Sequence, residues 1–281
     1  MKNIISAITM GILLAFIGYF GWTSYNKAKE YEATTLKIVQ KMNASDIAEQ
    51  KAKNILEEWS FGLYKNKDKI KLQQLNTQKN KAKAEAKRYI SYSVALAILM
   101  LLLYIVVPIR IFVFFNALSA LVMLLYGIFT PIMMVTIHKQ VEHFGDIILS
   151  LESKSVIGSA LKLYDKGDMV VAGVLLLFSV LIPLLKTLSM TFVSLFEYSS
   201  FAHSVIKFFK YLGKWSMVDV FVVATFLVYL TTSSGDISKA EIEVGIYFFL
   251  AYVIISMIVS LSADKMLHHY KQKDKSDTIT Q

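Results

Sequence analysis

Two ionisable residues stand inside otherwise apolar stretches of this sequence. Lys186 lies within LIPLLKTLSM (Leu181–Met190), and Asp219 lies within KWSMVDVFVVA (Lys214–Ala224). A charge inside a membrane helix costs a few kcal/mol or more, so such residues commonly mark ion or substrate pathways. A buried lysine also changes its protonation state readily. The pair could take up and release a proton, or it could form a structural ion pair that holds helices together; the sequence permits both.

The residues around Lys186 share one face of a predicted helix. Ser179, Pro183, Lys186 and Met190 follow the spacing i, i+4, i+7, i+11. Pro183 has no amide hydrogen, so the carbonyl of Ser179 loses its usual partner. Lys186 is therefore expected one turn below a free backbone carbonyl, on the same side of the helix.

Asp219 has polar neighbours of its own. Trp215 and Ser216 precede it by about one turn. A tryptophan suits the membrane interface, and a serine hydroxyl can donate a hydrogen bond to a carboxylate. These residues make the start of this helix a candidate partner for Lys186.

Two further predicted spans carry polar residues at helical spacing. The residues are Asn116, Ser119, Tyr126 and Thr130 in one span, and Tyr252, Ser256, Ser260 and Asp264 in the other. Each set falls on one helix face. Stripes of this kind most often make hydrogen bonds between helices, and a substrate path is the alternative. We include Thr130, Ser256 and Ser260 in the candidate polar site.

The composition requires a membrane around these helices. Hydrophobic residues make up 55% of the chain and charged residues 18%, so a soluble domain of this length would have too little polar surface to cover its core. The fold class we predict is an all-α polytopic membrane protein with about six transmembrane helices. The predicted spans are residues 4–23, 89–107, 109–135, 169–196, 218–231 and 245–261.

The spans divide the chain into five parts. They are an N-terminal transmembrane helix (1–25), a polar helical insert (26–88), a second transmembrane helix (89–110), a four-helix transmembrane module (111–269) and a tail (270–281). The insert, rich in Lys, Glu and Gln, is expected to form two or three helices or a hairpin, acting as a solvated spacer or as a docking surface. Pro131 is expected to kink the third span. Residues 138–168 are expected to form a mixed-charge loop with an amphipathic segment.

The distribution of basic residues predicts the orientation. Lys207, Lys210 and Lys214 lie between the fourth and fifth spans, and further lysines follow the sixth. By the positive-inside rule both regions are cytoplasmic, which places both termini in the cytoplasm and the insert outside it.

Several function classes find no support in the sequence. It contains no cysteine, which excludes disulfides, thiolate zinc sites and cysteine nucleophiles. We find no Gly-rich phosphate loop, nucleophile elbow or metalloprotease motif, and no nucleic-acid motif accompanies the net charge of +9. We expect no enzyme activity, no cofactor, no metal and no nucleic-acid partner.

Two stretches resemble a known family. GKWSMVDVFVVATFLVYL (Gly213–Leu230) and LLFSVLIPLLKTLSM (Leu176–Met190) are similar to the paraquat-inducible protein A family, whose module has four membrane helices. The similarity covers roughly Phe112 to His269, with SVIGSALKLYDKGD (Ser155–Asp168) in place of the family's outer loop.

The resemblance implies an inner-membrane protein of a Gram-negative envelope. Family members work with mammalian-cell-entry-domain proteins, whose rings form periplasmic tunnels for lipid traffic. For this chain the resemblance implies a polar site in the helix bundle that couples proton movement to phospholipid loading. Many relatives carry two modules and cysteine-rich zinc ribbons, whereas this chain has one module and no cysteine. The zinc site therefore does not carry over, and residues 1–88 and the second span have no counterpart that we can align.

The leading hypothesis is thus a subunit that loads or unloads phospholipid for a mammalian-cell-entry-domain tunnel. The alternative is a scaffold that transports nothing and recruits an envelope complex through the polar insert. A membrane stress sensor is a third hypothesis.

Overall fold

The computed structural model describes residues 2–40, 67–141, 145–195 and 238–279. In this part of the chain five helices are long and apolar enough to cross a membrane: Asn3–Gln40, Ile70–Ile105, Ile109–Phe129, Met169–Leu195 and Val244–Met266. They correspond to predicted spans one to four and six. The prediction of a polytopic helical membrane protein is confirmed. The count of six is not, because span five lies outside the described residues.

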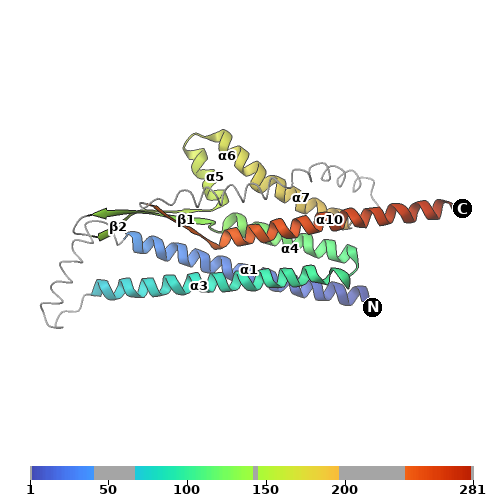
Figure 1. Cartoon of the computed structure of the whole chain (residues 1–281), viewed down its shortest axis with the longest axis horizontal. Coiled ribbons are helices and arrows are strands. Elements are labelled where there is room, and N and C mark those ends of the chain that lie inside the picture. Colours follow the sequence, from blue (N-terminus) through green and yellow to red (C-terminus); the bar gives the residue numbers. More distant parts are fainter. Residues whose placement is uncertain (1, 41–66, 142–144, 196–237, 280–281) are drawn as a thin grey trace.

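The first two long helices form an antiparallel hairpin. Helix α1 (Lys2–Gln40) lies along α3 (Lys67–Leu102), which ends in the short 3-10 turn η1 (Leu103–Ile105) (Figure 1). At about 1.5 Å per residue, the 39 residues of α1 extend about 58 Å, nearly twice the bilayer core of about 30 Å. The described parts of the predicted insert, residues 26–40 and 67–88, therefore continue the two spans beyond the membrane.

A heptad repeat holds the hairpin together. Five of the buried positions of α1 recur every seven residues, at Met10, Ile17, Ser24, Tyr31 and Ile38. This spacing is typical of a left-handed coil of two helices. The opposing buried positions of α3 are mostly small, namely Ala82, Ala86, Ser93 and Ala97. Small residues let two backbones approach closely inside a membrane.

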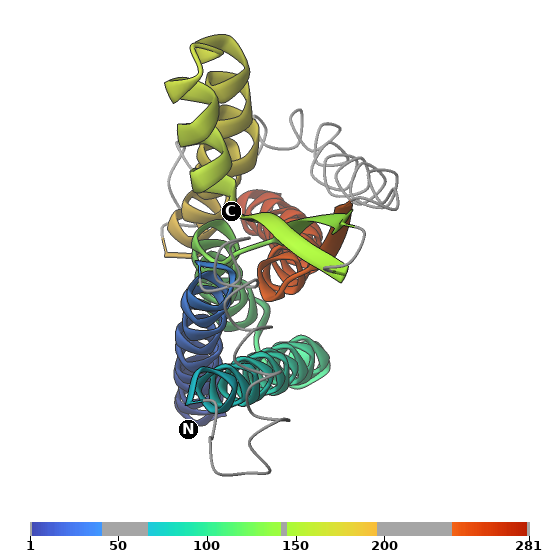
Figure 2. The same ribbon diagram turned by 90° about the vertical axis from the view of Figure 1, so that its left-hand side faces the viewer.

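Helix α4 (Ile109–Phe129) is the centre of the remaining bundle. It packs against α1, against α7 (Ile182–Leu195) and against α10 (Val244–Ile279). Figure 2 shows α4 between the hairpin and these later helices. Its buried side chains, among them Phe112, Met123 and Leu124, join Phe248 and Tyr252 of α10 in one core.

The third span is shorter than the sequence predicts. Helix α4 ends at Phe129, and Thr130 adopts an extended conformation with ψ 144°. The residue before a proline is disfavoured in the helical region. Pro131 therefore ends the helix; the predicted kink, and the predicted continuation to residue 135, were wrong.

A three-stranded antiparallel sheet follows α4. Strands β1 (Met133–Val141), β2 (Gly145–Lys154) and β3 (Ser238–Ile242) are ordered β2-β1-β3, with Met133 opposite both Lys154 and Ile242. The amphipathic segment expected within residues 138–168 is therefore a strand over residues 145–154. Val141, Ile147, Ile148 and Leu151 fall at approximate helical spacing, but β-branched residues and a pairing partner favour strands here.

Two short helices return the chain to the membrane. Helix α5 (Val156–Asp165) starts at Ser155, whose hydroxyl accepts a hydrogen bond of 3.1 Å from the Gly158 N–H. Helix α6 (Met169–Leu176), the π-helical turn η2 (Leu177–Leu181) and α7 then form the fourth span. The start of α1 and the end of α10 point to one end of the molecule, and the sheet lies at the other (Figure 1).

Candidate functional site

Lys186 lies on the buried face of α7. Pro183, Lys186 and Met190 are all buried, and Lys186 is only 6% exposed. Ser179 is half-buried in the π-helical turn just before Pro183. Proline commonly disturbs the helix that precedes it. The face predicted from the spacing therefore points into the bundle, and the helix loses its regular hydrogen bonding where the sequence predicts it.

The polar stripe of α4 points into the same bundle. Asn116, Ser119 and Thr130 are fully buried. Asn116 donates a hydrogen bond of 2.9 Å to the carbonyl of Phe112. The Oδ1 of Asn116 and the hydroxyls of Ser119 and Thr130 have no hydrogen-bond partner among the described residues. Buried polar atoms of this kind ordinarily bind water or a ligand.

Helix α10 contributes the third polar face. Tyr252 and Ser256 are buried, and Ser260 and Asp264 are half-buried. Because α4 packs against both α7 and α10, the polar faces of three helices belong to one bundle. Trp215, Ser216 and Asp219 lie outside the described residues, so the pairing of Lys186 with Asp219 stays a prediction.

The last described turn of α7 contacts the start of α4. Arg110 donates hydrogen bonds of 3.0 Å to the carbonyls of Ser194 and Leu195. Hydrogen bonds from a guanidinium to carbonyl oxygens are charge-assisted and therefore stronger than those between neutral groups. The contact fixes α7, and Lys186 with it, against α4.

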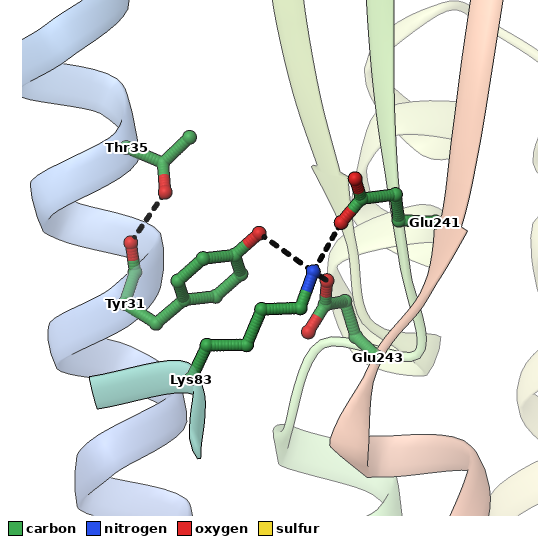
Figure 3. Close-up of polar contacts among 5 residues, drawn as sticks. All are labelled: Tyr31, Thr35, Lys83, Glu241 and Glu243. Atoms are coloured by element: carbon green, nitrogen blue, oxygen red, sulfur yellow. Dashed lines mark hydrogen bonds and ion pairs between the residues drawn. The ribbon is translucent and has the colours of Figure 1, made fainter. Parts of the chain in front are cut away.

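A second charged cluster, which sequence reasoning missed, lies at the sheet. It comprises Tyr31 of α1, Lys83 of α3, Glu241 of β3 and Glu243 between β3 and α10 (Figure 3). Lys83 Nζ forms an ion pair and a hydrogen bond with Glu241, lies 3.6 Å from Oε1 of Glu243, and donates a hydrogen bond of 3.3 Å to the Tyr31 hydroxyl. We call these four residues the hinge cluster.

Burial makes the two carboxylates of the hinge cluster unequal. The Glu243 side chain is 3% exposed, and that of Glu241 is 56% exposed. Burial raises the pKa of Glu243 to about 7, against the opposing attraction of Lys83. The hydrogen bond from Lys83 lowers the pKa of Glu241. Lys83 thus contacts two unlike carboxylates. Glu241 is exposed and charged, whereas Glu243 is buried and readily protonated.

Comparison with known proteins places most of this architecture in one family. The profile of the family described as "Paraquat-inducible protein A" matches residues 113–272, more than half of the chain. This chain belongs to that family. The range agrees closely with the Phe112 to His269 inferred from the sequence motifs, so the resemblance stated above is confirmed.

Individual relatives are distant. The chain is 24% identical over 135 residues to a protein of Escherichia coli (strain K12) named "Intermembrane transport protein PqiA", covering 46% of this chain and 32% of that protein. It is 24% identical over 124 residues to a Haemophilus influenzae protein named "Probable intermembrane transport protein", covering 42% and 29%. The chain thus spans about a third of the length of the curated relatives it matches. No solved structure matches.

The family match contains the described residues of the polar interior but only part of the hinge cluster. Thr130, Lys186 and Ser256 all lie within residues 113–272. The hinge cluster lies across the boundary, because Glu241 and Glu243 are inside the match whereas Tyr31 and Lys83 precede it. The polar interior therefore belongs to the paraquat-inducible protein A module alone. The hinge cluster joins that module to the hairpin.

Proposed function

We propose that this chain is an inner-membrane subunit of an intermembrane lipid transport system. It loads or unloads phospholipid for a periplasmic tunnel built of mammalian-cell-entry-domain proteins, and Lys186 and Asp219 couple the movement to protons. The observation that carries the proposal is the burial of Lys186 in a bundle whose other helices bury hydroxyl and amide groups. The printed name of the E. coli relative supports a transport role.

The polar interior suits an amphiphile rather than a simple ion. Asn116 and Ser119 of α4, and Thr130 just after its end, bury neutral polar atoms in the bundle. Such atoms can solvate a lipid headgroup or water without fixing a cation, and the surrounding apolar residues suit acyl chains. Lys186 adds a positive charge that attracts a phosphate.

Photo-crosslinking in living cells tests whether lipid enters the bundle. A photoreactive residue at Ser256 would report the interior, and one at Ile254, which is 49% exposed on the same helix, would report the surrounding bilayer. Thr130 and Phe129 form a second pair, and Ser179 and Leu181 a third, each differing in burial at nearly the same depth. Phospholipid captured preferentially at the interior position of each pair supports a transport route. Equal capture within the pairs rejects it.

Charge variants test the proton step. Lys186→Ala and Asp219→Asn should leave membrane insertion intact but abolish resistance to detergents and antibiotics. Leu188→Ala, at an exposed position of the same helix, is the matched control for Lys186. Normal resistance in correctly inserted Lys186 and Asp219 variants would remove proton coupling from the proposal.

The hairpin favours a second candidate function, a scaffold that recruits an envelope complex. The observation is that α1 and α3 pack together well beyond the length a bilayer needs. Deleting residues 36–74 would shorten this extension and leave Tyr31 and Lys83 in place. Loss of partner recruitment with unchanged lipid capture at Ser256 would assign docking to the hairpin. Unchanged recruitment would exclude the scaffold.

A further inference from the structure

Glu243 is a buried carboxylate at the place where the hairpin meets the family module. Its backbone is fixed, because its N–H donates a hydrogen bond of 2.9 Å to the carbonyl of Ile132 and the N–H of Gly245 donates one of 2.9 Å to Pro131. The backbone of Glu243 is therefore anchored to the segment that follows α4, whereas Lys83 and Tyr31, which lie beside its side chain, belong to the hairpin. Movement of the hairpin would change the surroundings of this side chain without moving its backbone.

The titratable groups that act on Glu243 come from three elements. Helix α3 contributes Lys83 and, at longer range, Lys87; α1 contributes Tyr31; and β3 contributes Glu241. Lys83 makes its hydrogen bonds to Glu241 and Tyr31. Its 3.6 Å separation from Oε1 of Glu243 is beyond hydrogen-bond range, and this atom has no hydrogen-bond partner among the described residues.

We propose that Glu243 is a proton-binding site, and that its protonation state sets how firmly the α1–α3 hairpin is docked on the paraquat-inducible protein A module. Neither the family nor its relatives' names assign a role to this position. The proposal does not depend on what the chain transports, because it concerns the joint and not the polar interior.

Charge balance gives the direction of the effect. With Glu243 protonated, Lys83 and Glu241 neutralise each other and the buried carboxyl is neutral. With Glu243 ionised, two carboxylates share the nearest ammonium, that of Lys83, and Oε1 of the buried carboxylate has no hydrogen-bond partner among the described residues. An under-compensated buried charge favours any movement that admits water. The docked hairpin is therefore favoured at low pH and loosened as the pH rises.

Thermodynamic linkage between proton binding and docking gives the pH range of the effect. Burial in the docked form raises the pKa of Glu243 from 4.5 to about 7. A state that raises the affinity for a proton is in turn stabilised by that proton. Docking should therefore change between about pH 5 and about pH 8. If the termini are cytoplasmic, the sheet and this site face the extracytoplasmic side and respond to its pH.

An infrared titration of the full chain in lipid nanodiscs tests the proton site directly. The signal is the carbonyl band of a protonated carboxylic acid, compared between the wild type and Glu243→Gln. The wild type should lose a band with a midpoint near 7 that Glu243→Gln lacks at every pH. Identical titrations of the two proteins would overturn the proposal.

A distance measurement tests the mechanical consequence. The chain contains no cysteine, so spin labels can be placed at Ala84→Cys on α3 and Leu161→Cys on α5, both exposed positions. In the wild type the distance distribution should lengthen or broaden as the pH rises through neutrality. In Glu243→Gln it should stay at its low-pH form. A wild-type distribution that does not change with pH, or the same change in Glu243→Gln, contradicts the proposal.

Glu241→Gln provides an independent variant. Removing this carboxylate takes away its repulsion of Glu243 and leaves Glu243 as the remaining carboxylate partner of Lys83 in the hinge cluster. Both changes lower the pKa of Glu243. The distance transition should persist but shift to lower pH. A transition that stays at the wild-type pH would assign it to another group and overturn the role of Glu243.

Discussion

Lys186 and Lys83 are two lysines in packed helices whose surroundings differ. Lys186 belongs to a face of α7 that is buried in the bundle, and α7 packs against α4, which buries an amide and a hydroxyl of its own. Lys83 lies at the edge of the membrane module and bridges two glutamates from the other end of the sequence. The first charge is conspicuous in the sequence because its neighbours are apolar. The second is one lysine among many in a polar segment, and only the fold gives it its partners.

The comparison implies different failures when each lysine is removed. Lys186→Ala should abolish the proposed transport at every pH, because no other described residue of the bundle interior offers a cation there. Lys83→Ala should reduce the proposed transport only in part. When the Lys83 ammonium is removed, Glu243 can bind a proton, so that no charge stays buried without a partner. The measurement is survival of cells on detergent across a range of pH. Equal losses in the two variants would break the distinction between a transport site and a joint.

Gly245 lies between the hinge cluster and the polar interior: it follows Glu243 in the chain and contacts Thr130 and Pro131 just after α4. It should tolerate no side chain. A Cβ at this position would lie 2.6 Å from the carbonyl oxygen of Thr130 and 2.7 Å from that of Pro131. Both are backbone atoms and cannot rotate away, so Gly245→Val should lower the free energy of unfolding by about 3 kcal/mol or more. Gly173→Val in α6, where an added Cβ meets nothing within 4 Å, is the matched control. Similar unfolding free energies for the two variants in lipid would refute the close contact.

The hinge cluster should also make stability depend on pH. The pKa of Glu243 is raised from 4.5 to about 7 by burial, so between these values the folded chain binds more protons than the unfolded chain. Stability therefore falls as the pH rises through this window and then levels off, by at most roughly 3 kcal/mol. Glu243→Gln should remove the fall and be the more stable protein at pH 8, with little difference at pH 4.5. A wild-type chain whose stability rises over this range would reverse the sign and exclude the raised pKa.

Much of the bundle could be predicted from the sequence because a bilayer leaves few alternatives. Backbone groups in hydrocarbon must bond within the helix, so apolar length locates a span, and the spacing of Pro183, Lys186 and Met190 locates its buried face. Apolar length alone misplaces the end of α4, because the apolar run continues past Pro131 to Val135, whereas the residue before a proline is disfavoured in the helical region.

The sheet and the hinge cluster could not be predicted in the same way. Strand β1 pairs with β3 across about a hundred residues of sequence, and nothing near Glu241 and Glu243 indicates that a lysine from α3 will reach them. One signal was available: the seven-residue spacing of Met10, Ile17, Ser24, Tyr31 and Ile38 predicts a coil that continues past the membrane. It would have brought Tyr31 onto the face that α3 covers, and Lys83 near it.

The smallest effect we expect comes from two neutral hydrogen bonds between α1 and α3. They contrast with the charged contacts of the hinge cluster in the same hairpin. The hydroxyls of Ser24 and Ser93 donate hydrogen bonds of 2.8 and 3.0 Å to the carbonyls of Ala86 and Ile17. Interhelical hydrogen bonds in membranes contribute about 0.6 kcal/mol each, so replacing both serines by alanine should cost about 1 kcal/mol, equally at every pH. Ser91→Ala, whose hydroxyl bonds within its own helix, should cost nothing measurable. A pH-dependent loss in the double variant would mean that the coil and the hinge cluster act as one unit, and that the joint begins further into the membrane than Glu243.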